Sequence, residues 1–198
     1  MQAGSTPVNG LDAGLRRLYG RLLSTGLPVF VGGSVAAMWY GEPRSTLDID
    51  LVVDASPADA ERIAAAFPAD AFYVPPVSVI REELRRGSAG QFNVIDLASG
   101  LKADVYVAGD DPLVAYGFAA SVERSVGDLS LKLAPATYVV AMKLRWYAIS
   151  HQEKHLRDIR GILALSPEAV DQDAVGGWAR RFGVEAAWEM CQRRPGEE

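Results

Sequence analysis

Two aspartates, Asp48 and Asp50, stand two residues apart in an apolar stretch of the chain. Residues at this spacing on a β-strand point to the same face, about 7 Å apart along the chain. We therefore expect the carboxylates to project together while Leu47, Ile49 and Leu51 pack behind them. Such a pair suffers mutual repulsion and desolvation, and a divalent cation with a preference for oxygen ligands, Mg²⁺ or Mn²⁺, relieves both costs. The alternative is a pair of aspartates that simply face water on an exposed strand.

A glycine turn, Gly32-Gly33-Ser34, lies between the apolar residues 28–31 and a predicted helix. Glycine lets the backbone approach a ligand without a Cβ in the way. Ser34 can cap the helix and offer its hydroxyl to a phosphate, and a helix start carries a partial positive charge. The order strand, glycine turn, helix is typical of an anion-binding turn. An ordinary strand-to-helix turn is the alternative.

The two motifs together are more specific than either alone, because thirteen residues separate the glycine turn from the Asp-Ile-Asp motif. With Arg44 and Thr46 ahead of Asp48, the arrangement resembles the signature of the nucleotidyltransferase superfamily. It looks most like the AbiEii-related branch, which contains bacterial nucleotidyltransferase toxins. The resemblance is closest over residues 28–54. It implies an α/β fold, with a mixed sheet flanked by helices and a C-terminal helical region after it.

The resemblance also implies a third carboxylate on a neighbouring strand. Asp104 is the preferred candidate, because its flanking residues look like the last catalytic strand of the family. Asp96, on the strand that should pair with it, is the competing candidate. Tyr106 shares a face with Asp104 by its spacing. The alternative for Asp104 is a solvated residue on a strand.

By resemblance, the protein transfers a nucleoside monophosphate from a nucleoside triphosphate (NTP) to a hydroxyl acceptor and releases pyrophosphate. The three aspartates would bind two Mg²⁺ or Mn²⁺ ions. Asp104 could also take the proton of the nucleophile, and Gly33 and Ser34 would hold the β- and γ-phosphates. Lys143 is the family-like cation for the triphosphate, unless it is a solvated helix residue. Arg44 either contacts phosphate, neutralises the carboxylates or makes a surface ion pair.

The acceptor expected from the resemblance is an RNA end, a protein or a small molecule, and the toxin kinship suggests an antitoxin as partner. A catalytically inactive nucleotide-binding or regulatory module of the same fold is the alternative function. A metal-dependent phosphohydrolase is less consistent with a chain that has two histidines. We expect His151 and His155 at the surface, the tryptophans in packing, and Asp158 paired with Lys143 or an arginine.

The spacing of hydrophobic residues along the chain predicts the strands and helices that position these candidate site residues. Residues 72–80 contain Pro75-Pro76 and are expected to be irregular or an edge strand. We expect a flexible tail over residues 1–10, a nucleotidyltransferase core over 11–134 and a helical region over 135–198. Strands are expected over residues 28–31, 47–53, 92–97, 101–107, 121–126 and 129–133, and helices over 11–24, 35–40, 57–67, 135–149, 152–165 and 178–190.

The composition sets limits on the class of protein. The chain has 198 residues, 49% of them hydrophobic, with a formal net charge of -5 and a single cysteine. An internal disulfide is therefore excluded, and the acidic balance argues mildly against a large nucleic-acid footprint. The densest basic stretch is 143–160. No apolar run has the length of a membrane span and no secretory signal is recognisable, so we expect a cytoplasmic protein that does not enter a membrane.

Overall fold

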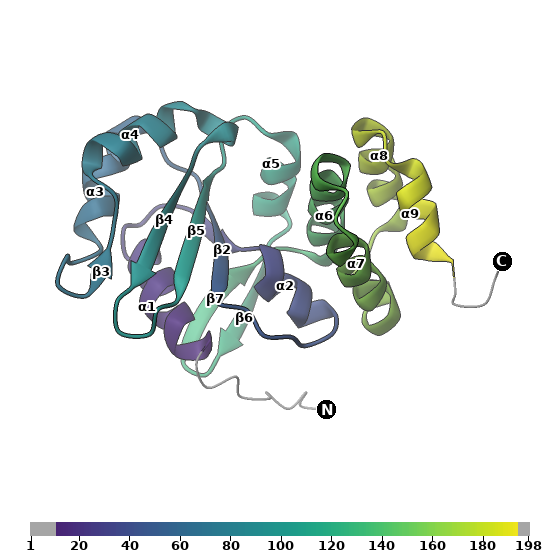
Figure 1. Cartoon of the computed structure of the whole chain (residues 1–198), viewed down its shortest axis with the longest axis horizontal. Coiled ribbons are helices and arrows are strands. Elements are labelled where there is room, and N and C mark those ends of the chain that lie inside the picture. The colour runs from purple at the N-terminus through teal and green to yellow at the C-terminus, as the bar shows by residue number, and fades with distance from the viewer. Residues whose placement is uncertain (1–10, 194–198) are drawn as a thin grey trace.

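The computed structural model of the chain describes residues 11–193, and its core is one seven-stranded sheet with helices around it (Figure 1). The predicted tail, residues 1–10, lies outside the described residues. The strands are β1 (Val29–Val31), β2 (Asp48–Val53), β3 (Phe72–Tyr73), β4 (Gln91–Asp96), β5 (Lys102–Val107), β6 (Val122–Val126) and β7 (Leu129–Leu133). The helices are α1 (Leu11–Leu23), α2 (Gly33–Tyr40), α3 (Ala60–Ala65), α4 (Val77–Arg85), α5 (Pro112–Ala119), α6 (Ala136–Ser150), α7 (Glu153–Leu165), α8 (Gln172–Phe182) and α9 (Glu185–Gln192).

The sheet is mixed, with the strand order β3-β4-β5-β2-β1-β7-β6. Strands β2 and β5 run parallel, as do β1 and β7, whereas the remaining neighbours are antiparallel. The predicted hairpins β4–β5 and β6–β7 are both present. A mixed sheet with helices around it and a helical C-terminal part confirms the fold class expected from the sequence.

The two central strands β2 and β5 alternate between a buried and a more accessible face. Ile49 and Leu51 of β2 are fully buried, as are Ala103 and Val105 of β5. The intervening polar residues therefore share the opposite face, since side chains alternate along a strand. Leu47 departs from the expectation, because it precedes β2 and is 74% exposed.

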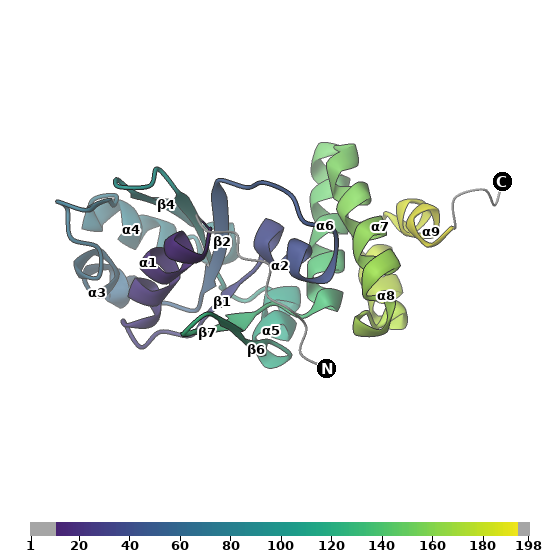
Figure 2. The ribbon, with the colours of Figure 1, turned by 90° about the horizontal axis from the view of Figure 1, so that it is seen from below.

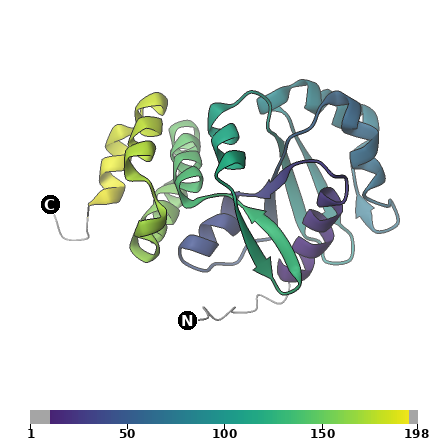
Figure 3. The same cartoon turned by 180° about the vertical axis from the view of Figure 1, so that it is seen from behind.

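Helices cover the sheet and join it to the helical region. Helix α1 buries Leu15, Leu18 and Leu22 against β1, β4 and β7, as its helical spacing predicts. Helix α2 packs on β2, and α4 packs on β4. Seen from behind, the β6–β7 hairpin lies beside α1 at one side of the sheet (Figure 3).

Helices α6 to α9 gather at one end of the molecule, beside α2 and α5 (Figures 1 and 2). Helix α6 contacts both α2 and α5, and α7 also contacts α2. The last strand ends at Leu133 and α6 begins at Ala136. Within residues 11–193, no helix is both long and apolar enough to cross a membrane.

The structure differs from the sequence expectation in several helices. A single helix over residues 178–190 is wrong, because Gly183 adopts φ 68° and separates α8 from α9. This left-handed conformation favours glycine and ends a helix. Helix α4 takes up residues 77–80 of the segment expected to be irregular or an edge strand, and β3 forms a short edge strand at its start. The pattern does not predict α5, although Asp111 caps it and Pro112 opens it.

Candidate active site

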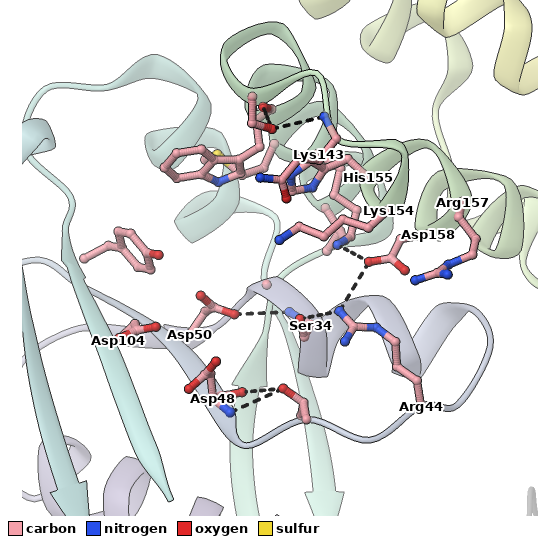
Figure 4. A pocket seen from close by; sticks show the side chains of 18 of the residues that line it. Ser34, Arg44, Asp48, Asp50, Asp104, Lys143, Lys154, His155, Arg157 and Asp158 are labelled. Carbon is pink, nitrogen blue, oxygen red and sulfur yellow. Dashed lines mark hydrogen bonds and ion pairs between the residues drawn. The ribbon is translucent and has the colours of Figure 1, made fainter.

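A pocket of about 500 Å³ opens between the sheet and the C-terminal helices. Its floor comes from β2, β5 and the start of α2, and its opposite wall comes from α6 and α7 (Figure 4). Every predicted site residue except Gly32 lines it. Those residues are Gly33, Ser34, Arg44, Asp48, Asp50, Asp104 and Lys143.

The three aspartates lie on one face of two adjacent parallel strands. Asp50 is the direct register partner of Asp104, and Asp48 stands two residues earlier on β2. Because β2 and β5 run parallel in this register, the alternating pattern of both strands brings the three carboxylates to the same pocket. Figure 4 shows them side by side at the pocket floor.

Asp50 is partly buried beside the N-terminus of α2. Burial raises its pKa, the Ser34 backbone N–H opposes this shift, and the neighbouring charge of Asp104 raises the pKa further. Ser34 N donates to Asp50 Oδ2 over 3.2 Å. The N-terminus of α2 therefore already holds one anion, the carboxylate of Asp50, and a phosphate that uses this amide would share or displace it.

Gly33 has to be glycine for two independent reasons. Its φ of 50° lies in the left-handed region that other residues rarely adopt. A Cβ at this position would collide with the carboxylate of Asp50. The close approach expected of the glycine turn is thus an approach to Asp50. Gly32 lies behind it, and its N–H donates to the backbone oxygen of Asp50 over 2.9 Å.

Asp104 carries an oxygen that is available for a ligand. Its Oδ1 is buried and accepts no hydrogen bond from the described residues. The ammonium of Lys102 lies 3.2 Å from this oxygen, an ion pair without hydrogen-bond geometry. A buried oxygen without a hydrogen bond is costly, and a cation is one way to satisfy it. Asp104 is therefore not the solvated strand residue that the sequence left open.

Asp96, the competing third carboxylate, lies away from this pocket. It is fully buried and accepts hydrogen bonds from Arg17 Nη2 (2.8 Å) and Ser99 Oγ (2.7 Å). Although burial alone would raise the pKa of Asp96, the hydrogen bonds from Ser99, Ala98 and Arg17 lower it. Asp96 thus fixes the turn after β4 and ties it to α1.

Oxygen donors from three carboxylates suit Mg²⁺ or Mn²⁺, and the unsatisfied oxygen of Asp104 fits such an ion. Between residues 11 and 193, however, no three His, Cys, Asp or Glu side chains already converge on one point as a metal ion requires. The fit of the metal therefore rests on donor chemistry and neighbourhood, and the carboxylates have to reorient to share an ion.

Arg44 links the glycine turn to α7. Its Nη2 donates to Ser34 Oγ over 2.6 Å and lies 3.4 Å from Asp158 Oδ2. Arg44 therefore forms an ion pair, as one of the alternatives from the sequence allowed, but this ion pair lies in the pocket. The positive charge of Arg44 thus lies beside Ser34, where the triphosphate is expected to bind.

Lys143 is buried, so the solvated helix residue considered from the sequence is wrong. Its Nζ donates to Asp158 Oδ2 over 2.6 Å, which confirms the expected pairing of Asp158. Burial lowers the pKa of Lys143, and Asp158 opposes this shift. The ion pair joins α6 to α7 at the pocket wall.

The α7 side of the pocket contains Lys154 and Arg157, which the sequence did not single out, and His155, which was expected at the surface. Lys154, His155 and Arg157 line the pocket, all from the densest basic stretch of the sequence. His155 is only partly exposed, against the expected surface position, and burial together with the charges of Lys143 and Lys154 lowers its pKa to about 4. It is therefore neutral at pH 7, and the lysines and arginines supply the charge. We call Arg44, Lys143, Lys154 and Arg157 the basic wall.

Aromatic residues also line the pocket, among them Trp146 and Tyr106. Trp146 lines it and remains 40% exposed, so packing alone does not account for it. Tyr106 lies two residues after Asp104 on the same face, as expected. Burial raises its pKa far above the usual range, with the charges of Asp50 and Asp104 adding to the effect. The phenol is therefore a neutral donor.

Comparison with solved structures identifies the fold. An antigenic nucleotidyltransferase-like protein from Paracoccidioides brasiliensis superimposes with a TM-score of 0.57 at 15% identity, over 92% of this chain and 93% of that one. The antibiotic-resistance factor ANT(2'')-Ia gives a TM-score of 0.50 at 13% identity, over 90% and 98% of the two chains. The fold is thus that of the nucleotidyltransferases.

The family follows from the sequence of the whole chain. Residues 16–186 match the family described as nucleotidyl transferase AbiEii toxin, Type IV TA (toxin–antitoxin) system. The protein belongs to this AbiEii family of nucleotidyltransferases, as its motifs predict. No curated protein sequence matches the chain significantly.

Proposed function

We propose that the protein transfers a nucleoside monophosphate from an NTP to a hydroxyl acceptor in a metal-dependent reaction that releases pyrophosphate. One observation carries the proposal: Asp50 and Asp104 are register partners beside the glycine turn, with the basic wall across the same pocket. Acidic residues suit a cation, basic residues suit a polyanion, and a metal–triphosphate complex contains both.

Asp48, Asp50 and Asp104 would hold divalent metal. A bound ion would neutralise charge on the triphosphate and lower the pKa of the attacking hydroxyl. The buried Oδ1 of Asp104 is an acceptor for the proton of that hydroxyl. Its place at the pocket floor keeps it close to the two other carboxylates.

The basic wall would bind the phosphates. Arg44 holds the Ser34 hydroxyl and thereby shapes the turn that faces the triphosphate. Lys143 and Arg157 line the pocket from α6 and α7, opposite the carboxylates, and would contact the phosphates there. Trp146 offers an exposed aromatic face to a nucleobase.

The acceptor is a hydroxyl of an RNA end, a protein or a small molecule. The family description supports a role in a toxin–antitoxin pair, in which an antitoxin would be the partner. The formal charge of -5 favours an acceptor that is recognised at the pocket over one held by a wide basic surface.

The test is incubation of the purified protein with each α-³²P-labelled NTP, Mg²⁺ or Mn²⁺ and a cell extract, followed by separation of RNA, protein and small molecules. Label should move into one class of acceptor. Asp104→Asn should abolish the transfer. Asp54→Asn is the matched control, because Asp54 follows β2 at its other end, is exposed and does not line the pocket.

The outcomes separate the candidate functions. Labelled acceptor that depends on Asp104 supports the transferase. Nucleotide binding without transfer, unchanged in Asp104→Asn, supports a binding module. Release of free phosphate from γ-³²P-labelled NTP, with no acceptor labelled from α-³²P-labelled NTP, supports a phosphohydrolase.

A further inference from the structure

Lys102 is a cation beside the acidic floor of the pocket, where it forms ion pairs with Asp48 and Asp104. It opens β5 and stands two residues before Asp104, so both side chains lie on the same face. Lys102 is also the direct register partner of Asp48 on the parallel strand β2. The face therefore carries a square of four side chains, Asp48 beside Lys102 and Asp50 beside Asp104.

The ammonium of Lys102 lies between two of the carboxylates. Its Nζ is 3.3 Å from Asp48 Oδ1 and 3.2 Å from Asp104 Oδ1. The side chain of Asp104 is 13% exposed and that of Lys102 is 33% exposed, so water screens this contact only in part. The oxygen of Asp104 that accepts no hydrogen bond is the one closest to the ammonium.

We propose that Lys102 is an internal counterion that competes with a free divalent cation for Asp48 and Asp104. This inference rests on the proposed function, because it concerns the ions of the same site. One ammonium beside three carboxylates removes a third of their charge. It also lies where the oxygens of Asp48 and Asp104 would have to meet on a shared ion.

Competition of this kind makes cation binding depend on the nucleotide. Without nucleotide, a divalent ion has to displace or tolerate a positive charge at the oxygens it needs. A triphosphate adds several negative charges to the pocket and gives the Lys102 ammonium another anion to contact. The site should therefore bind its ion weakly alone and tightly together with NTP.

The test measures Mn²⁺ binding to the full chain by electron paramagnetic resonance, without nucleotide and with a non-hydrolysable NTP analogue. Lys102→Met removes the charge and keeps most of the side-chain length, whereas Lys102→Arg keeps the charge. Lys132→Met is the matched control, because Lys132 is exposed on β7, which pairs with neither β2 nor β5, and because its substitution changes the net charge equally.

Without nucleotide, Lys102→Met should lower the Kd for Mn²⁺ on the order of tenfold, as expected when a unit charge near a divalent ion is removed in a solvated pocket. Lys102→Arg and Lys132→Met should bind Mn²⁺ like the parent protein. The gain should shrink when the NTP analogue is present. Mn²⁺ should also raise the Tm of Lys102→Met more than that of the parent, because the uncompensated carboxylates then depend on the ion.

If the parent protein binds Mn²⁺ through Asp104 and Lys102→Met binds it with the same Kd, the role of Lys102 is overturned and the proposed function stays intact. An equal gain in Lys132→Met also overturns it, because net charge alone would explain the effect. Absence of Mn²⁺ binding in every variant, with and without the NTP analogue, overturns the metal-dependent function and the role of Lys102 together.

Discussion

The buried ion pair between Lys143 and Asp158 gives a prediction whose size follows from the structure. Both side chains are about nine-tenths buried, with 9% and 10% of their surface exposed, and the charged atoms are 2.6 Å apart. Asp158→Asn leaves the ammonium of Lys143 without its carboxylate. Stranding a buried charge in this way costs about 3–5 kcal/mol.

Deprotonation of Lys143 limits the cost. A lysine with an unfolded-state pKa of about 10.4 can be made neutral at pH 7 for about 4.6 kcal/mol, at 1.36 kcal/mol per pH unit. We therefore expect Asp158→Asn to lower the free energy of unfolding by about 3–4 kcal/mol at pH 7.

The pH dependence has a definite sign. Burial already lowers the pKa of Lys143 in the folded chain, and loss of Asp158 lowers it further. Between the folded and the unfolded pKa the unfolded state binds more protons, so the stability of Asp158→Asn rises with pH. At pH 9.5 neutral Lys143 costs about 1.2 kcal/mol, and most of the penalty should disappear.

Lys143→Met should be the milder change. Asp158 then keeps Arg44, whose Nη2 lies 3.4 Å away and is more exposed, so we expect a loss of about 1–2 kcal/mol. The assay is urea unfolding at pH 7 and pH 9.5, with Asp173→Asn on the exposed face of α8 as control. Equal losses in both variants at both pH values would refute the reasoning.

Three further changes test the pocket. Asp50→Asn should abolish transfer and raise the free energy of unfolding by about 1–2 kcal/mol at pH 7. Burial raises the pKa of Asp50, so its charge lowers the stability of the fold above that pKa. A less stable variant would contradict this. Gly33→Ala should lower the free energy of unfolding by about 1–2 kcal/mol, because alanine rarely adopts the positive φ of this position. It should also lower transfer activity, because the new Cβ displaces the Asp50 carboxylate. Urea unfolding and the labelling assay measure the two effects, and a fully active variant argues against the second. Trp146→Ala should weaken NTP binding about fivefold or more in calorimetry with little change in Tm, because Trp146 is partly exposed in the pocket; unaltered affinity removes it from the nucleobase site.

The sequence alone predicts the Asp48–Asp50 pair and the glycine turn, because each depends on residues that are neighbours along the chain. Alternation along β2 places Asp48 and Asp50 on one face whatever the strand pairs with. The glycine turn before α2 follows from residue types that few other conformations need. Only the family resemblance favours Asp104 over Asp96, because periodicity alone does not distinguish the two strand residues.

Only the tertiary structure decided what each charged residue faces. Strand register sets Lys102 against Asp48, and a shift by one residue would move it to the other face. The packing of α7 against α6 and α2 brings Lys143, Asp158 and the basic wall to the carboxylates, although more than ninety residues separate Asp50 from Lys143. Burial then fixes which residues keep their charge. These contacts join distant parts of the chain, and residue order along the chain contains no direct signal for them.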